Sequence, residues 1–484
     1  MKKSVVKNYM YNLVYQILIL ILPLVTTPYL SRVLGSDGVG IYSYTYAVVT
    51  YFVLFGSLGI SLYGQREIAY AQDQPRKRKK IFFELIIIRF ITVLIAAIVF
   101  FLWFVRGDQY QTYYMILLIE LFATAFDISW FFQGIEEFKK TVVRNVLVRI
   151  ISVSFVFIFV KTSEDLWKYI LIYSLGDFLG NLLLWFYLPK YLKGGKVPRL
   201  SFKRHLIPLL LLFIPQVTNK LYNLLDTTML GALISDKSET GYYEQSQKVI
   251  RVLLTIVTSL GVVMVPRMAN TYAHGNKKQI NSYLKNSFNF VFIVSFPMMY
   301  GIATIATAFV PIFFGAGYDK SAILIMIFAP MLVLQGIENV IGTQYLLPTK
   351  RQKEYTISVA IGVLTNLILN YIFILQWASI GAAVATVISQ IVVDGIQIWY
   401  VRKDLRWGPI IQLFVKYLFA STIMFIACSA IKLIVNTGVA SIVLQCAIGM
   451  VVYVGMLFLL KDKFLYRILN TIKSKFLQFK NSLA

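Results

Sequence analysis

The sequence predicts an all-α polytopic membrane protein, with about fourteen transmembrane helices in two pseudo-symmetric bundles around a central cavity. Three observations lead to this fold class: the composition, the recurrence of long apolar runs, and a weak internal repeat. Of the 484 residues, 58% are hydrophobic and only 14% are charged, whereas soluble domains average about 25% charged residues. A soluble multidomain enzyme is therefore excluded, and the aromatic content of 15% excludes a disordered chain.

The fourteen apolar runs are each long enough to cross about 30 Å of hydrocarbon as a helix. They must be helical because a backbone in lipid has to satisfy its own hydrogen bonds, and the alternation of a β-barrel is absent. In chain order the runs cover about 9–31, 41–64, 82–105, 112–133, 142–160, 166–188, 206–233, 242–266, 286–313, 321–347, 354–375, 379–401, 411–434 and 440–460. The first run lacks a small-x-small cleavage site, so we expect a membrane span there and not a cleaved signal peptide.

The charged residues predict the orientation of these spans. The 47 Lys and Arg residues outnumber the 22 Asp and Glu residues, for a formal charge of +25. The basic residues concentrate at the N-terminus, in the connections after even-numbered spans (the run 76–80 is an example) and in the C-terminal tail. By the positive-inside rule, we expect both termini to lie in the cytoplasm. Topology and anionic membrane lipids account for the charge, so no nucleic-acid partner is expected.

The two halves of the chain repeat weakly at matching spacings. Gly40 precedes Arg66 by the same 26 residues that separate Gly241 from Arg267. Asp127 and Gln133 in span 4 correspond to Glu338 and Gln344 in span 10, and the aromatic end of span 6 (185–187) corresponds to 398–400. We therefore predict an N-terminal lobe at 1–204 (spans 1–6), a C-terminal lobe at 205–403 (spans 7–12), and an appended region at 404–484 with spans 13 and 14 and a basic tail. Parallel repeats of this kind favour a cavity between two bundles.

Polar residues form stripes on three of the predicted helices. Steps of three and four residues place each set on one helix face, which cannot face lipid. The stripes are Asn8, Asn12 and Gln16 in span 1; Gln216, Asn219, Lys220, Asn223, Asp226 and Thr227 in span 7; and Glu244, Gln247, Lys248 and Arg251 in span 8. The cations predict an anion site, because phosphate is attracted strongly where the dielectric is low. The alternative is structural pairing of Glu244 with Lys248 and of Lys220 with Asp226, but Arg251 has no obvious acidic partner on its own helix.

Other charges fall inside the spans. We expect Arg149 to face a cavity with Asp177 as its partner. Arg89 is expected to snorkel to the membrane surface, with pairing to Glu84 as the alternative, and Lys416 and Lys432 are expected to snorkel as well. The acids within spans would suit coupling to a proton or Na⁺, because burial lets a carboxylate titrate near neutral pH. Equally, they could serve as partners for the buried cations. These acids are Glu120, Asp127, Asp177, Asp226, Glu338 and Asp394.

Catalytic and metal sites are not indicated. Cys428 and Cys446 lie in apolar spans, and no Cys/His spacing typical of a metal site occurs. The two histidines, His205 and His274, are expected in cytoplasmic loops. No Gly-rich ATP-binding loop is present. We therefore predict no enzyme activity, no cofactor and no bound metal.

Several segments resemble polysaccharide repeat-unit flippases (Wzx-type) of the multidrug/oligosaccharidyl-lipid/polysaccharide (MOP) exporter superfamily. They are 27–35 (TPYLSRVLG), 38–42 (GVGIY), 130–136 (WFFQGIE), 366–370 (NLILN) and 381–386 (GAAVAT). The resemblance implies a MATE-like fold and transport of an undecaprenyl-pyrophosphate-linked oligosaccharide from the cytoplasmic to the outer leaflet by alternating access, for capsule or other cell-surface polysaccharide. It further implies a cationic cavity, for which Lys220, Lys248, Arg251 and Arg149 are candidates. Arg32, within the first matched segment, is a further candidate that could equally cap its helix.

Two other functions are compatible with parts of this pattern. A multidrug exporter of the same superfamily would share the fold, but lipophilic cations favour an acidic cavity, whereas the stripes of spans 7 and 8 are rich in cations. A membrane polymerase or glycosyltransferase would need a sizeable loop with paired acids or histidine, and every connection here is short. Besides the lipid-linked glycan and membrane lipids, the partners to consider are Na⁺ or H⁺ and the polysaccharide assembly machinery.

Overall fold

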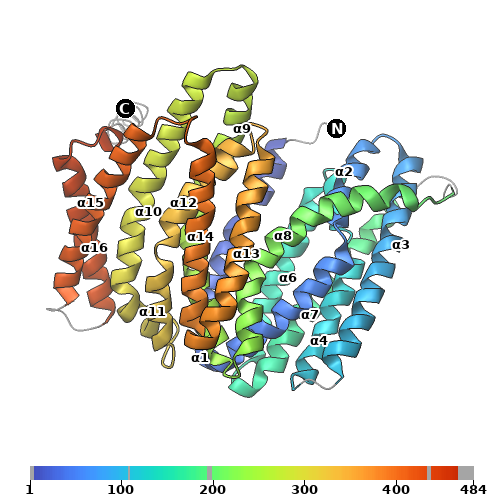
Figure 1. Ribbon diagram of the computed structural model, residues 1–484. Helices are drawn as coiled ribbons and strands as arrows, with labels where there is room; N and C mark the ends of the chain where they lie inside the picture. The colour runs from blue at the N-terminus through green and yellow to red at the C-terminus, as the bar shows by residue number, and fades with distance from the viewer. Residues whose placement is uncertain (1–4, 107–108, 193–198, 433–437, 467–484) are drawn as a thin grey trace, which may run out of the picture. The chain divides into compact units, whose positions relative to one another are not determined.

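The computed structural model describes residues 5–106, 109–192, 199–432 and 438–466. All regular secondary structure in these ranges is helical, which confirms the predicted fold class (Figure 1). The chain divides into two compact units, Met1–Gly241 and Tyr242–Ala484.

The first unit contains eight α-helices among its described residues. They are α1 (Val5–Ser57), α2 (Ile60–Tyr70), α3 (Pro75–Phe100), α4 (Gln111–Phe126), α5 (Ser129–Gly134), α6 (Phe138–Phe159), α7 (Leu166–Tyr187) and α8 (Lys203–Leu233). A π-helical turn, η1 (Phe101–Val105), continues α3, and two 3₁₀ turns, η2 (Ser163–Asp165) and η3 (Leu188–Lys190), flank α7. The helix α8 packs against α1 and α2. The compact units therefore divide after α8, and the predicted lobe boundaries at 204 and 403 stay a prediction.

The second unit begins within α9 (Ser238–Ala273). It continues with α10 (Lys277–Phe313), α11 (Asp319–Phe328), α12 (Met331–Glu338), α13 (Gln352–Trp377), α14 (Ser379–Val401), α15 (Trp407–Lys432) and α16 (Val439–Leu459). A π-helical segment, η4 (Asn339–Leu346), follows α12 directly. Within this unit α13 packs along α14, and α10 packs against α15.

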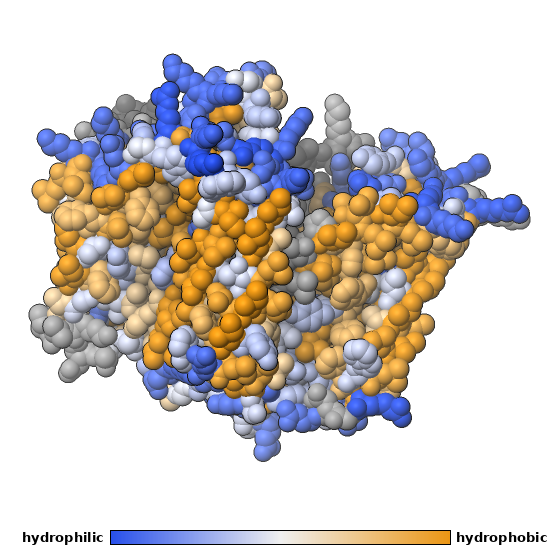
Figure 2. All heavy atoms as spheres, viewed as in Figure 1, coloured by the Kyte–Doolittle hydropathy of each residue, from blue (hydrophilic) through white to orange (hydrophobic). Residues whose placement is uncertain are grey.

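Each predicted apolar run coincides with helix. Twelve helical stretches in the described residues, some of them interrupted, are long and apolar enough to span a membrane. One of them, Ile21–Tyr70, covers parts of two predicted runs, and α8 contains predicted span 7. Hydrophobic side chains cover the middle of the helices and hydrophilic ones gather at their ends (Figure 2).

Three predicted spans are not single helices, and in this respect the prediction was wrong. Span 2 breaks at Leu58 and Gly59, both with positive φ. Span 4 breaks between α4 and α5, and span 10 breaks at Ala329 and Pro330, where Pro removes a helix hydrogen bond. Such breaks expose backbone groups that other side chains must satisfy in a membrane.

Gly40 and Gly241, counterparts in the predicted repeat, lie against each other. A Cβ added at Gly40 would be 1.7 Å from the carbonyl oxygen of Lys237, and one at Gly241 would be 2.0 Å from that of Ser36. Ser36 and Lys237 each precede their glycine by four residues, so the contact is reciprocal. Small residues at such a crossing allow two helix backbones to touch, and the symmetry of the contact supports the repeat.

Candidate functional site

A polar cavity of about 380 Å³ lies within the first unit. It is bounded by α1, α3, α4, α6 and α7, and by the break between α4 and α5. Six charged residues line it: Arg89, Arg144, Arg149, Glu120, Asp127 and Asp177. Three positive and three negative side chains thus meet inside a bundle whose outer surface is apolar. Charges in such a place require partners or water, and each can be traced to its contacts.

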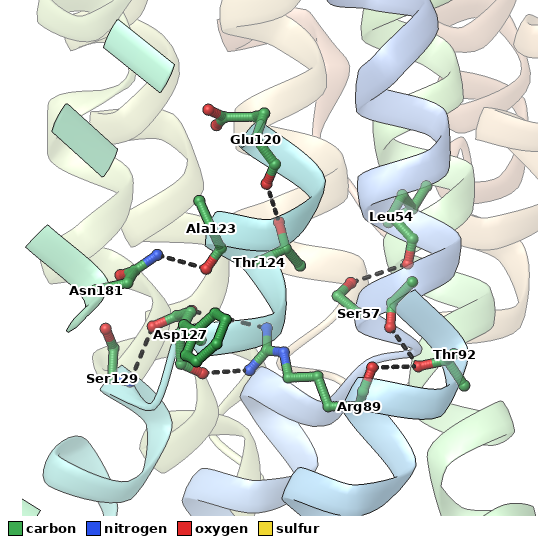
Figure 3. Close-up of polar contacts among 12 residues, drawn as sticks. Leu54, Ser57, Arg89, Thr92, Glu120, Ala123, Thr124, Asp127, Ser129 and Asn181 are labelled. Atoms are coloured by element: carbon green, nitrogen blue, oxygen red, sulfur yellow. Dashed lines mark hydrogen bonds and ion pairs between the residues drawn. The ribbon is translucent and has the colours of Figure 1, made fainter. Parts of the chain in front are cut away.

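The break between α4 and α5 is held by side chains from α7. At the break, the Asp127 N–H turns to the Thr124 carbonyl (3.3 Å), so the Ala123 carbonyl loses its usual helical donor. Asn181 Nδ2 donates to this oxygen at 2.7 Å (Figure 3). Trp185 Nε1 donates to the Phe126 carbonyl at 2.8 Å. The interruption of the spanning helix is therefore stabilised by built-in donors.

Arg89 of α3 lies at the same break and does not snorkel, contrary to the prediction. Its side chain is only 2% exposed. Nη1 donates to the Asp127 carbonyl at 2.7 Å, and Nη2 lies 3.7 Å from Asp127 Oδ2 (Figure 3). The predicted alternative partner, Glu84, instead contacts Arg204 and His205. Arg89 therefore pairs with a half-buried acid 38 positions away and does not extend to the membrane surface.

Asp127 directly follows α4 and contacts residues of α3, α5 and α6. Its Oδ1 accepts from the backbone N–H of Ser129, the first residue of α5, at 2.9 Å. The same carboxylate lies 4.0 Å from Arg144 Nη2 of α6, and Arg144 also donates to Ser129 Oγ at 2.7 Å. Because Arg89 and Arg144 both face this carboxylate, Asp127 serves as a counter-ion for resident cations. This favours the alternative in which Asp127 pairs with cations of the chain over ion coupling at this residue.

Arg149 and Asp177 form the predicted ion pair, with Nη2 and Oδ2 3.5 Å apart. Glu120 lines the same cavity and interacts electrostatically with both. These three residues also line a second cavity of about 30 Å³, together with Tyr42, Tyr46 and Tyr173. The Arg149 guanidinium lies 5.6 Å from the centre of the Tyr173 ring. Arg149 therefore lines a cavity inside the first unit, and its role in anion binding stays a prediction.

The stripe of span 7 lies on α8, and only part of it is described at the side-chain level. Lys220 is exposed, Asp226 is buried, and Gln216 donates to the Leu212 carbonyl at 2.9 Å. The side chains of Asn219 and Asn223, like those of Asn12, Gln16 and Lys432, lie outside the described residues. Their lining of a cavity stays a prediction.

The stripe of span 8 lies on α9, and its pairing differs from the prediction. Arg251 Nη2 lies 3.5 Å from Glu244 Oε2, and Arg251 also donates to Gln247. The expectation that Arg251 has no acidic partner on its own helix was thus wrong, because residues seven apart on an α-helix share a face and the long Arg side chain spans two turns. The Arg251 side chain nevertheless stays 48% exposed, and Lys248 is half-buried.

Two further expectations were wrong. His205 does not lie in a loop but in the first turn of α8, with 1% exposure; its Nδ1 contacts the Tyr63 hydroxyl (2.8 Å) and its Nε2 contacts Glu84 (2.9 Å). Lys416 does not snorkel, since its Nζ lies 2.6 Å from Asp462 Oδ2. Arg32, within α1, is exposed. The partners of His205 and Lys416 are distant in the sequence, so helical spacing alone could not identify them.

Sequence reasoning missed several residues of the cavity. Arg144 lies near the start of predicted span 5 and was not among the charges predicted inside the spans. Asn181 lies four residues after Asp177 and hence on the same face of α7, a signal that could have identified it. Ser129 gave no signal, because its role depends on the break at Asp127.

Comparison with known proteins places this chain in a family. The model of the family described as polysaccharide biosynthesis protein matches residues 5–272, more than half of the chain, and the MatE model matches residues 212–372. A putative O-antigen transporter of Escherichia coli K12 is 25% identical over 412 residues, covering 83% of this chain and 98% of the relative. The lipid II flippase MurJ of Bacillus subtilis is 22% identical over 294 residues, 54% of each chain.

Solved structures agree on the fold. The lipid II flippase MurJ in an inward closed conformation has a TM-score of 0.74 at 19% identity, covering 95% of this chain and 99% of that one. An inward-facing MATE family multidrug resistance transporter of the MOP superfamily has a TM-score of 0.59 at 12% identity, covering 78% and 94%. These structural likenesses support the MATE-like fold. The family-model matches and the O-antigen transporter relative agree with the predicted resemblance to Wzx-type flippases of the MOP exporter superfamily, and the match over more than half of the chain shows the family: the chain belongs to the polysaccharide biosynthesis protein family.

Proposed function

We propose that this protein translocates an undecaprenyl-pyrophosphate-linked oligosaccharide from the cytoplasmic to the outer leaflet of the bacterial cytoplasmic membrane, for assembly of capsule or another cell-surface polysaccharide. The relatives named as an O-antigen transporter and a lipid II flippase support a lipid-linked glycan as the cargo. A third relative, 26% identical over 168 residues, is named a probable low-salt glycan biosynthesis flippase of Haloferax volcanii. All three names describe transport, and the proposed activity breaks no covalent bond.

The observation that carries the proposal is the accessible cationic charge on membrane-spanning helices. Lys220 of α8 is exposed, and the Arg251 side chain of α9 is 48% exposed although it contacts Glu244. A carboxylate 3.5 Å away holds the guanidinium in one orientation without covering it, so a pyrophosphate could bind through two parallel hydrogen bonds. Lys248, one turn before Arg251, adds a second charge on the same face.

In the proposed cycle, the cations bind the pyrophosphate while polar side chains bind the sugars. Asn12, Gln16, Gln216, Asn219, Asn223 and Gln247 are the proposed polar lining. Arg149 and Arg32 are the remaining proposed anion-binding residues. Alternating access would move the bound headgroup between leaflets while the lipid tail stays in the bilayer. Of the acids proposed for coupling, Glu120, Asp177, Asp226 and Glu338 remain candidates, whereas Asp127 is disfavoured because Arg89 and Arg144 pair with it.

The test is complementation of a strain that lacks its own repeat-unit flippase. Arg251→Ala should reduce surface polysaccharide at least tenfold, because a desolvated charge–phosphate contact contributes about 2–3 kcal/mol. The matched control is Arg66→Ala, which removes an exposed Arg paired with its neighbour Glu67 (3.3 Å) and should retain wild-type polysaccharide. Membrane levels of each variant are compared by immunoblot. Normal polysaccharide in the Arg251→Ala strain would show that this residue does not bind the cargo.

A multidrug exporter is the second candidate, because the MatE model matches residues 212–372 and three acids line the cavity of the first unit. A drug extruder would lower the accumulation of a lipophilic cation such as ethidium in cells. We expect no such change upon expression of this protein. A drop in ethidium accumulation that Arg251→Ala leaves intact would favour the second candidate.

A further inference from the structure

Arg251 of α9 is held by two side chains of its own helix. Its Nη2 lies 3.5 Å from Glu244 Oε2, and the same nitrogen donates to the side-chain oxygen of Gln247. Steps of three and four residues place these three side chains on one helix face. Neither contact uses Nε or Nη1, so the exposed guanidinium keeps donors with which it can bind a phosphate.

Gln247 is in turn held by a buried tyrosine one turn earlier in α9. Gln247 Nε2 donates to the Tyr243 hydroxyl at 2.7 Å. Tyr243 is 0% exposed, and its hydroxyl lies 3.1 Å from Thr386 Oγ1 of α14. Thr386 donates to the Ala382 carbonyl at 2.8 Å. These contacts form a hydrogen-bond relay within the second unit, from Arg251 through Gln247 and Tyr243 to Thr386.

The hydrogens along this relay have a defined direction. The Thr386 hydroxyl has one hydrogen, which it donates to the Ala382 carbonyl. The Tyr243 hydroxyl therefore has to be the donor in its contact with Thr386. Its oxygen then accepts from the NH₂ group of Gln247, and it has no second hydrogen for the amide oxygen. Consequently the NH₂ group of Gln247 faces Tyr243, and the amide oxygen faces Arg251.

This orientation matters because the last torsion angle of a glutamine is broad and nearly two-fold. A flipped Gln247 amide would place its NH₂ group against the Arg251 guanidinium, which has donors but no acceptor. It would also place the amide oxygen against the Tyr243 oxygen, whose hydrogen is already donated to Thr386. The relay thus excludes the flipped orientation and keeps an acceptor directed at the cation.

The far end of the relay lies in a tightly packed part of α14. Thr386 ends the segment 381–386 (GAAVAT), whose three alanines are 0% exposed. A Cβ added at Gly381 would be 2.1 Å from the Phe373 carbonyl oxygen of α13, so the backbones of α13 and α14 touch here. Small residues permit such a contact between membrane helices, and side chains in so dense a packing have little freedom to move. Thr386 is therefore a fixed point for the relay.

Other contacts hold this part of α9 in place without the relay. Ser321 Oγ of α11 donates to the Tyr242 carbonyl at 3.3 Å, and Ser246 Oγ donates to the Ser321 carbonyl at 3.2 Å. The Tyr243 ring packs against the Phe328 ring, with their centres 5.3 Å apart. Loss of the Tyr243 hydroxyl should therefore leave the helix where it is and change only the orientation of the amide that the hydroxyl holds.

We propose that Tyr243 and Thr386 are positioning residues, which act through Gln247 to hold Arg251 in the orientation that binds the pyrophosphate of the cargo. The inference rests on the proposed function for the identity of this anion. A guanidinium binds phosphate best through two parallel hydrogen bonds, which require a fixed plane. Ordering a long side chain on binding lowers affinity, so a guanidinium that is already held binds more tightly than a mobile one.

The test measures the Kd of geranyl pyrophosphate, a short-chain lipid pyrophosphate, for the purified full-length protein in detergent by isothermal titration calorimetry. Tyr243→Phe removes only the hydroxyl and should raise this Kd about three- to tenfold. Thr386→Val should do the same, because Tyr243 can then donate to a flipped amide, whereas Thr386→Ser keeps the hydroxyl and should retain the wild-type Kd. The matched control Tyr453→Phe removes another buried hydroxyl of this unit, which donates to the Ile293 carbonyl at 2.9 Å, and should also retain it.

A double-mutant cycle separates orientation from a general loss of structure. Gln247→Leu breaks the relay, so Tyr243→Phe should raise the Kd no further in that background, whereas a structural effect would add to it. An unchanged Kd in Tyr243→Phe, or additive effects in the cycle, overturns the inference; if Arg251→Ala still weakens binding, the anion site itself stands. A wild type that does not bind geranyl pyrophosphate overturns the site and its positioning together. The expected cycle in a protein that fails complementation overturns the proposed function alone.

Discussion

The network around the α4–α5 break makes a quantitative prediction for Arg89. Arg89→Met keeps much of the side-chain volume but removes a guanidinium that is 2% exposed. It leaves the Asp127 carbonyl without its 2.7 Å donor and the carboxylate with the Ser129 N–H at 2.9 Å and the Arg144 cation at 4.0 Å. Breaking a buried ion pair costs about 3–5 kcal/mol. Because Arg144 partly compensates, we expect a loss of about 3 kcal/mol in the free energy of unfolding.

The assay is reversible unfolding of the purified protein in mixed detergent micelles, with tryptophan fluorescence as the signal. Arg66→Met is the control, since the exposed pair of Arg66 with Glu67 should contribute at most about 1 kcal/mol. Arg89→Met/Asp127→Asn should recover part of the loss, because it removes the stranded charge. If Arg89→Met costs no more than Arg66→Met, the membrane interior does not impose the predicted penalty and our interpretation of the break is wrong.

Two further predictions concern the helix crossing and the end of α16. Gly40→Ala should cost at least about 2 kcal/mol through overpacking, because its Cβ would meet the Lys237 carbonyl at 1.7 Å; Gly395→Ala, with no atom within 4 Å, should cost nothing measurable. Burial alone would raise the pKa of Asp462, but hydrogen bonds, first from Lys416, hold this pKa below its usual range. That stabilisation is present above about pH 4 and is lost as the pH falls through the lowered pKa. Lys416→Met should therefore cost about 3 kcal/mol at pH 7 and progressively less below pH 4, as measured by unfolding at each pH; equal losses at all pH values would contradict this assignment.

The sequence was sufficient to locate the spans but not their interruptions. Apolar runs predict helices because a membrane leaves the backbone no other option, and every run coincides with helix. The break at Asp127 depends on donors from α3 and α7, which hydropathy does not reveal. The same holds for Arg89, whose nearest acid in the sequence is Glu84, whereas its partner in the fold is Asp127.

Pairing on a single helix was partly predictable. Steps of three and four correctly predict which residues share a face of α9. They did not predict the ion pair of Arg251 with Glu244, because the long Arg251 side chain spans two turns. The pair of Arg149 with Asp177 was predicted because their spans are consecutive, and consecutive helices usually pack together. Glu84, by contrast, contacts His205 from 121 positions away. Partners this far apart in the sequence are fixed by tertiary packing, which spacing does not encode.

The most direct test of the account is translocation by the purified protein in liposomes. A fluorescent undecaprenyl-pyrophosphate oligosaccharide is placed in the inner leaflet, and its arrival outside is followed by cleavage with an added glycosidase. We predict faster arrival than in protein-free liposomes, with the rate lowered at least tenfold by Arg251→Ala and unchanged by Arg66→Ala. Arrival no faster than in protein-free liposomes, from protein whose unfolding shows that it is folded, would contradict the proposal that this protein moves a lipid-linked glycan.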